Sequence, residues 1–319
     1  MHKESAFQYN NDELFMNPKV EQYGSHMVMT NVRRDIKKKY WNIDTQFRDD
    51  YQEYSSNNPT QYTFSLPQSI NNAKSIRVVN FELPMTYNNI SPGLNNYLLT
   101  ITSGSTVYPI GIPAGAYSSI SSIVDAINTQ ISGTALNGYV NFSVNGSYVK
   151  FNTLNVGTFT LNIATGGLNN VLTTFDKYNL KTKLGWLLGF RQLNYTLSDS
   201  GSRQSVQSEC FWNINNIRYI YLACDDFVTS NPNSFIAGLP TSLLNKNILA
   251  KISIDRVIYP YGSILPANPS NGYLHSDKRA YAGITNIQRL KVQLVNEYGQ
   301  PLDLNGADFS FCIEIEYEG

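Results

Sequence analysis

Charged side chains are scarce in this 319-residue chain: they make up 15% of it, against roughly 25% in an average soluble protein. The 24 basic and 24 acidic residues cancel. That balance excludes the simplest kind of dedicated nucleic-acid binder, which carries a global or domain-wide positive excess. The polar surface is therefore expected to consist mainly of uncharged side chains, among them the 22 tyrosines. Such a composition favours a protein whose surface meets other protein, and stable all-β monomers share it.

Cysteine and long apolar runs are also scarce. The three cysteines, Cys210, Cys224 and Cys312, are an odd number without metal-ligand spacing, so we expect free thiols in a reducing compartment. The first ten residues are polar and lack the apolar core of a secretory signal. No run approaches the roughly 18–20 apolar residues that span a bilayer. We therefore expect a soluble protein, made inside a cell, with no transmembrane segment.

The motifs that mark common enzymes are missing as well. The sequence contains no phosphate-binding loop, no dinucleotide-binding glycine pattern and no nucleophile elbow. Of the three histidines, His2 and His26 lie near the N-terminus, and His275 lies in a polar stretch that predicts an exposed loop. Asp225 and Asp226 follow a predicted strand, where adjacent side chains point to opposite faces, so a solvated loop is expected in preference to a cation site. We predict no enzyme activity, no cofactor and no metal.

Residues 1–39 form a polar arm without periodicity, too poor in apolar residues to fold alone. The arm ends in a basic run with five positive charges against one negative, and this run contributes all of the candidate partner-binding residues. These candidates are Arg33, Arg34, Lys37, Lys38 and Lys39. Such a run can contact nucleic acid or an acidic neighbouring surface. The plainer interpretation is a solvated linker that leads into the first strand.

Alternating apolar residues predict strands on both sides of the central region. The apolar residues of 62–66 alternate with polar ones, which predicts a half-buried strand that ends at Pro67. In 75–84 the apolar positions change face after Val78, which predicts a β-bulge or burial on both faces. Later strands are predicted over residues 217–224, 247–254, 285–295 and 309–317.

Residues 95–196 predict an inserted α/β subdomain. A hairpin is predicted over 97–112, followed by the only convincing helix, at 118–131, whose isoleucines and valine form one apolar stripe. Three short strands are predicted between 139 and 163, the first two joined by a turn at Asn145-Gly146.

The flanking strands predict one antiparallel sandwich built from residues 40–94 and 197–319 and interrupted by this subdomain. Residues 197–208 are expected to be a loop that leads back to the sandwich. The apolar, glycine-punctuated stretch 183–190 is expected to dock the subdomain onto the rest.

Four stretches, taken in order, carry a further resemblance. They are Tyr62–Pro67 followed by Ser75–Pro84, Gly115–Ser119 at the start of the helix, Leu184–Phe190, and Asp308–Glu316. Their order and spacing resemble the minor capsid and vertex (penton) proteins of large DNA viruses of protists and algae and of their virophages. The resemblance covers most of residues 60–317 and leaves the arm uncovered. It implies a mainly β fold, a single jelly-roll antiparallel sandwich of eight strands that carries the α/β insertion outward.

The same resemblance implies a structural role in an icosahedral capsid, most directly as the penton. Five copies would then ring the five-fold axis as a homopentamer with heterologous contacts, beside major and minor capsid proteins. The arm would reach a neighbour or make a weak nucleic-acid contact, and the protein, made in the host cytoplasm, would reside in the virion. Three alternatives stay open: a minor or cement capsid protein, a spike or host-attachment protein whose insertion binds glycans, and an enzyme on a β scaffold.

Overall fold

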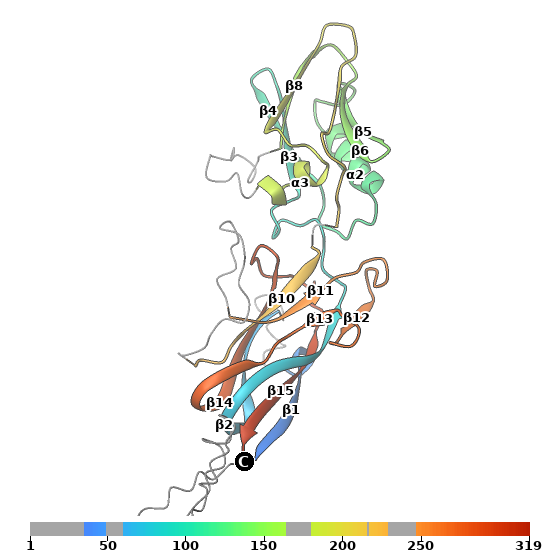
Figure 1. Ribbon diagram of the computed structural model, residues 1–319. Helices are drawn as coiled ribbons and strands as arrows, with labels where there is room; N and C mark the ends of the chain where they lie inside the picture. The colour runs from blue at the N-terminus through green and yellow to red at the C-terminus, as the bar shows by residue number, and fades with distance from the viewer. Residues whose placement is uncertain (1–34, 49–59, 164–179, 216, 229–246) are drawn as a thin grey trace, which may run out of the picture.

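The computed structural model describes residues 35–48, 60–163, 180–215, 217–228 and 247–319, and these form two units stacked end to end (Figure 1). The first, called here the sheet unit, contains β1, β2 and β10 to β15. The second, called here the insertion, comprises residues 90–215 and lies at the opposite end from the C-terminus. No helix among the described residues is long and apolar enough to cross a bilayer.

The sheet unit is a curled antiparallel sheet in the order β1-β15-β2-β14-β10-β11-β13, with β12 also paired to β2. Its strands are β1 (Ile36–Asp44), β2 (Gln61–Pro84), β10 (Tyr219–Asp225), β11 (Ile248–Ser253), β12 (Ile264–Ala267), β13 (Leu274–His275), β14 (Arg279–Asn296) and β15 (Ser310–Glu318). A 3-10 turn, η1 (Thr45–Phe47), follows β1. The mainly β, jelly-roll class of fold predicted from the sequence is confirmed.

The long strand β2 connects the two halves of this sheet. Its first part pairs with β14, and its second part pairs with β15 and β12. The prediction that Pro67 ends the strand is wrong, because β2 continues to Pro84. Proline lacks an N–H, and Pro67 lies between Ser65 and Ile70, where the pairing with β14 is irregular and no ladder bond is lost.

The predicted bulge in β2 is confirmed. Pairing with β15 jumps from Asn80 to Val78, so Val79 is the extra residue. Without it, the apolar side chains before and after this point would face opposite sides of the sheet. With it, Val78 and Phe81 both lie fully buried in one core, where the Phe81 ring stacks on Phe309 at 5.6 Å.

The insertion has its own core between two small sheets and a helix. One sheet has the order β4-β3-β7-β8 and the other β5-β6-β9. Their strands are β3 (Leu98–Ser103), β4 (Thr106–Gly111), β5 (Val140–Asn145), β6 (Tyr148–Thr153), β7 (Gly157–Asn162), β8 (Asn194–Asp199) and β9 (Ser205–Gln207). The β5–β6 turn consists of Gly146 and Ser147, and Gly146 has the positive φ of +59° that the first position of such a turn favours.

The predicted helix is present as α2 (Ile120–Ser132). Ser119 caps its N-terminus by accepting a hydrogen bond from the backbone N–H of Ser122, and the helix ends at Gly133. The five residues of the predicted apolar stripe are its five buried residues: Ile120, Ile123, Val124, Ile127 and Ile131.

The insertion extends further along the chain than the expected boundary at residue 196. Instead of a loop over 197–208, β8 pairs with β7 and β9 pairs with β6. Ile214 still belongs to the insertion core, and the Asn89 side chain donates to its carbonyl oxygen at 3.2 Å. The chain therefore enters and leaves the insertion at one place.

The apolar stretch 183–190 packs mostly inside the insertion and includes the short helix α3 (Leu184–Leu187). A Cβ on Gly185 would lie 2.3 Å from the Ile163 Cβ, so only glycine allows this approach. Trp186 and Leu187 alone extend from α3 to the junction with the sheet unit.

Candidate functional site

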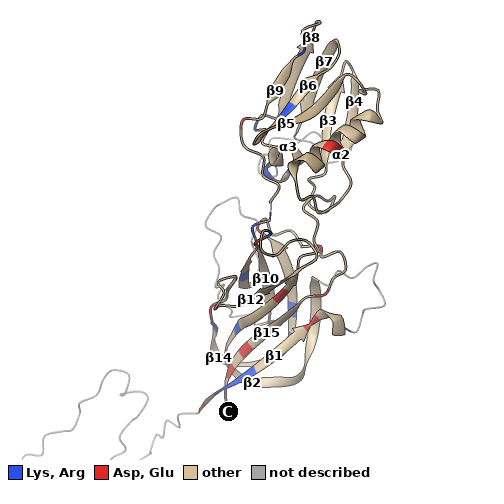
Figure 2. Ribbon diagram, turned by 90° about the vertical axis from the view of Figure 1, so that its right-hand side faces the viewer, with Lys and Arg blue, Asp and Glu red and all other residues tan. Residues whose placement is uncertain are grey.

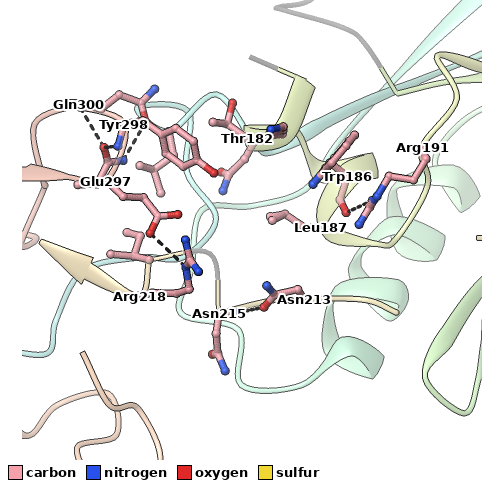
Figure 3. A pocket seen from close by; sticks show the side chains of 15 residues that line it. Thr182, Trp186, Leu187, Arg191, Asn213, Asn215, Arg218, Glu297, Tyr298 and Gln300 are labelled. Carbon is pink, nitrogen blue, oxygen red and sulfur yellow. Dashed lines mark hydrogen bonds and ion pairs between the residues drawn. The ribbon is translucent and has the colours of Figure 1, made fainter. Parts of the chain in front are cut away.

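A cavity of about 190 Å³, called here the junction cavity, lies between the two units (Figure 3). Trp186 and Arg191 come from the insertion, and Glu297 and Tyr298 come from the turn that follows β14. Arg218, immediately before β10, also lines the cavity. The cavity thus draws its walls from segments far apart in the sequence, and no motif in the sequence marks it.

Charge pairs and stacking fix the walls of the junction cavity. Arg218 Nε lies 3.4 Å from Glu297 Oε2, and the arginine side chain is 68% exposed while the glutamate side chain is 8% exposed. The Arg191 guanidinium lies 3.9 Å from the centre of the Trp186 ring and donates to the Trp186 carbonyl oxygen. Burial and the nearby Glu297 carboxylate raise the pKa of the Tyr298 hydroxyl, which therefore stays protonated as a donor.

The candidate basic residues fall in two places. Arg33 and Arg34 lie outside the described residues. Lys37, Lys38 and Lys39 lie in β1, which begins at Ile36, so the last part of the expected arm is a strand. Lys38 forms ion pairs with Glu314 at 3.3 Å and Glu316 at 3.8 Å, and Lys39 Nζ donates to Gln68.

Strands β1, β15 and β2 carry residues of opposite charge side by side (Figure 2), and these residues form ion pairs between the strands. Glu314 accepts from Tyr40 at 2.7 Å and from Arg77 at 2.8 Å, besides its contact with Lys38. Burial alone would raise the pKa of Glu314, but these three donors lower it to about 2. Pairing of β15 with β1 and β2 brings Lys38, Arg77 and Glu314 together, and their charges neutralise one another.

Asp225, the last residue of β10, and Asp226 separate as strand geometry requires: Asp225 is half-buried, whereas Asp226 is buried. Asp225 accepts from the Phe227 backbone, whereas the Asp226 side chain is fully buried against Arg279 at 3.4 Å and Tyr281 at 2.7 Å. The expectation of a solvated loop is therefore wrong for Asp226. Strand β14 begins at Arg279, six residues before the predicted start, and this early start supplies the buried cation.

The remaining candidates for chemistry lie apart from one another. His275 is exposed on β13, 3.6 Å from Asp277. The cysteines are free thiols, and burial raises the pKa of Cys224 to about 12, which keeps it protonated. Within the described residues, no group of three or more His, Cys, Asp or Glu side chains is placed to hold a metal ion.

An exposed apolar segment, called here the apolar loop, runs from residue 255, after β11, to Ile264, the first residue of β12. Val257 is 90% exposed, and three other large apolar side chains are more than half exposed. These are Ile258 at 61%, Tyr261 at 58% and Ile264 at 61%. Exposed apolar groups that gather in this way mark surfaces that contact other molecules.

The apolar loop is held rigidly despite its exposure. Asp255 accepts from the backbone N–H groups of Val257 at 2.9 Å and Ile258 at 3.1 Å. Met85 exchanges two backbone hydrogen bonds with Gly262 and Ser263. A surface that is ordered before contact loses little conformational entropy on binding.

No protein-family model and no curated protein matches the sequence. Among solved structures, the chain is similar to the mavirus penton protein, with 12% sequence identity and a TM-score of 0.43 over 89% of this chain and 99% of that one. It is also similar to a chain in the structure of the Sputnik virophage, with 13% identity and a TM-score of 0.38 over 88% of this chain and 98% of that one.

Proposed function

We propose that this chain is a structural subunit of an icosahedral virus capsid and that five copies form its vertex. The apolar loop is the observation that carries the proposal. Four exposed apolar side chains on a rigid loop form the kind of surface that another subunit covers. The sequence resemblance to penton and minor capsid proteins supplies the class of assembly.

A five-fold ring needs two different patches on each subunit, because its contacts are heterologous. The apolar loop offers one patch. The second, called here the apolar edge, lies on β1 and η1, where Ile36, Tyr40 and Phe47 are 62%, 56% and 77% exposed. Strand β1 ends the order of the sheet, so its outer backbone groups are open to pairing as well.

The proposal also gives roles to the insertion and to the basic run. The insertion lies at the far end of the sheet unit from the C-terminus and would project outward from the shell. Contact with nucleic acid or with an acidic neighbour would fall to Arg33, Arg34, Lys37 and Lys39, because Lys38 is already paired with Glu314 and Glu316. Such a contact would strengthen at low salt.

Native mass spectrometry of the full chain over a concentration series tests the proposal. We expect a species near five times 35.9 kDa. The double substitution Val257→Ser and Ile258→Ser should raise the protein concentration needed to form this pentamer at least tenfold. Val107→Ser is the matched control, because Val107 is a 56% exposed apolar residue of the insertion, outside both patches.

The outcome separates the vertex role from its rivals. A stable trimer would contradict a five-fold vertex and favour a spike. A monomer at every concentration would favour the cement role. If the double variant and the Val107→Ser control form the pentamer equally well, the apolar loop is not part of the interface.

A further inference from the structure

We propose that the junction cavity binds an acidic monosaccharide, that is, a sugar ring bearing a carboxylate. This site lies beyond the proposed assembly role, since no residue of the apolar loop or of the apolar edge lines the cavity. The inference rests on the charge of the cavity, on its aromatic walls and on its size.

The charge of the cavity favours a negatively charged ligand. Lys181, Arg191 and Arg218 line it together with one carboxylate, that of Glu297. The insertion is otherwise poor in charge, since only 10 of its 126 residues are charged, and two of them, Lys181 and Arg191, reach this cavity. A polar cavity with three cations and one anion attracts an acidic ligand.

The donors that remain in the cavity suit a carboxylate. Arg218 makes one long ion pair, 3.4 Å to Glu297, its guanidinium carbon lies 5.7 Å from the centre of the Tyr219 ring, and its side chain is 68% exposed. A guanidinium has five N–H donors in a planar fork that matches a carboxylate. The other exposed cation that lines the cavity is Lys181.

The other walls suit the ring and the hydroxyl groups of a sugar. Figure 3 shows Tyr298 and Glu297 on one side of the cavity and Trp186 on the other. Aromatic rings offer apolar surface to the C–H faces of a sugar ring. The Glu297 carboxylate accepts hydrogen bonds, which the hydroxyl groups of a sugar can donate.

The size of the cavity suits one small ring. Its volume of about 190 Å³ lies below the roughly 300 Å³ at which pockets for drug-sized ligands begin. Asn296 holds one wall in place by accepting from the backbone N–H groups of Tyr298 and Gln300, both at 3.0 Å. A site that is formed before the ligand arrives binds it at a lower entropic cost.

Saturation-transfer NMR on the full chain tests this site with three probes: D-glucuronate, D-glucose and inorganic phosphate. We expect glucuronate to bind at least tenfold more tightly than either of the others. Glucose tests whether the carboxylate is needed, and phosphate, followed by its own phosphorus resonance, tests whether any anion suffices. Equal binding of glucuronate and phosphate, or of glucuronate and glucose, would overturn the assignment.

Two arginines provide a matched pair of variants. Arg218→Gln removes the cation that pairs with Glu297 in the cavity and should weaken glucuronate binding at least tenfold. Arg203→Gln is the control: Arg203 is 56% exposed and also pairs with a buried carboxylate, that of Asp199, but lies outside the cavity. Lys181→Gln should weaken binding by a smaller factor. Unchanged binding in Arg218→Gln, or an equal loss in Arg203→Gln, would overturn the proposal.

Discussion

The sheet unit and the insertion satisfy their polar groups in different ways. The sheet unit relies on charge: Glu314 accepts from a lysine, a tyrosine and an arginine, and Asp226 pairs with Arg279 where both side chains are fully buried. The insertion begins in a stretch, residues 83–149, that contains a single charged residue, Asp125. Its polar groups therefore have to be satisfied mainly by amides and hydroxyls.

Asparagine side chains make many of the hydrogen bonds to backbone groups in and at the edge of the insertion. The Asn128 side chain donates to the Phe142 carbonyl oxygen at 2.9 Å and accepts from the Phe142 N–H at 2.8 Å, which ties α2 to β5. Asn89 makes the same pair of bonds with the backbone of Tyr117. On the outer face of β7 and β8, Thr160 and Thr196 share a hydrogen bond of 2.9 Å.

The difference has a physical consequence. Charged pairs lose strength with added salt or with protonation, and a buried pair that loses one partner leaves an uncompensated charge. Neutral amide and hydroxyl bonds respond to neither salt nor moderate acid. The two units are thus expected to fail separately and under different conditions, and four predictions test this expectation.

The largest change to the chain is the removal of the whole insertion, and it tests whether the sheet unit folds without it. Because Asn89 bonds to Ile214, the two crossing points lie together, and a short Gly-Ser linker can replace residues 90–215. We expect the remaining sheet unit to unfold in one cooperative transition, since Leu94 is the one buried residue of its core that lies within the deleted stretch. Near-ultraviolet circular dichroism and calorimetry measure this. A shortened chain without a cooperative transition would show that the two cores depend on each other.

The next largest effect concerns the buried ion pair. Arg279→Met should destabilise the sheet unit by about 3–5 kcal/mol, because it removes one partner of a fully buried ion pair. Arg203→Met in the insertion should cost less than about 1 kcal/mol, because Arg203 is largely exposed and Asp199 keeps bonds from Gly201 and Thr153. Urea unfolding gives both values. Similar losses in the two variants would remove the contrast between the units.

How far the sequence predicts these features depends on the range of the contacts. The stripe of α2 and the bulge at Val79 are visible because each is a local pattern of apolar residues, and the structure has both. Strands β8 and β9 escape prediction because their polar composition resembles a loop. Only pairing with β7 and β6, which lie roughly 35–60 residues earlier in the chain, makes them strands.

The basic run and the junction cavity are even harder to predict from the sequence, because their contacts join residues far apart in the chain. The basic run is evident in the sequence, but its neutralisation by Glu314 and Glu316 depends on pairing between β1 and β15, at opposite ends of the chain. Arg218 and Glu297 of the junction cavity are 79 residues apart. Contacts at such separations follow from topology, which local pattern does not specify.

A third prediction uses pH to isolate the charge network of the sheet unit. The pKa of Glu314 is about 2 in the folded chain against a usual 4.5, so its contribution to stability is complete above about pH 4.5 and is lost as the pH falls toward 2. Glu314→Gln should lower stability at pH 7 by roughly 1.5–3 kcal/mol, typical of hydrogen bonds to a charged group. It should also flatten the stability profile between pH 4.5 and 2.

Denaturant unfolding at stepped pH measures this profile. Asp125→Asn, at an exposed acid on α2, is the control and should leave the profile unchanged. An equally steep acid loss in Glu314→Gln and in the unmodified chain would assign the acid sensitivity to other groups.

The smallest losses of stability are expected from two surface substitutions, one in each unit. Their expected sizes overlap, so the dependence of each loss on salt has to distinguish them. Lys38→Ala removes partly exposed ion pairs with Glu314 and Glu316, and Thr196→Ala removes one cross-strand hydroxyl bond; each should cost less than about 1 kcal/mol. Salt separates them, since the screening length falls to about 3 Å in 1 M salt. The cost of Lys38→Ala should shrink between 0.05 and 1 M NaCl, roughly the range over which screening becomes strong, while that of Thr196→Ala should stay constant. If both costs respond to salt alike, charge pairing and hydroxyl pairing are not the distinction between these surfaces.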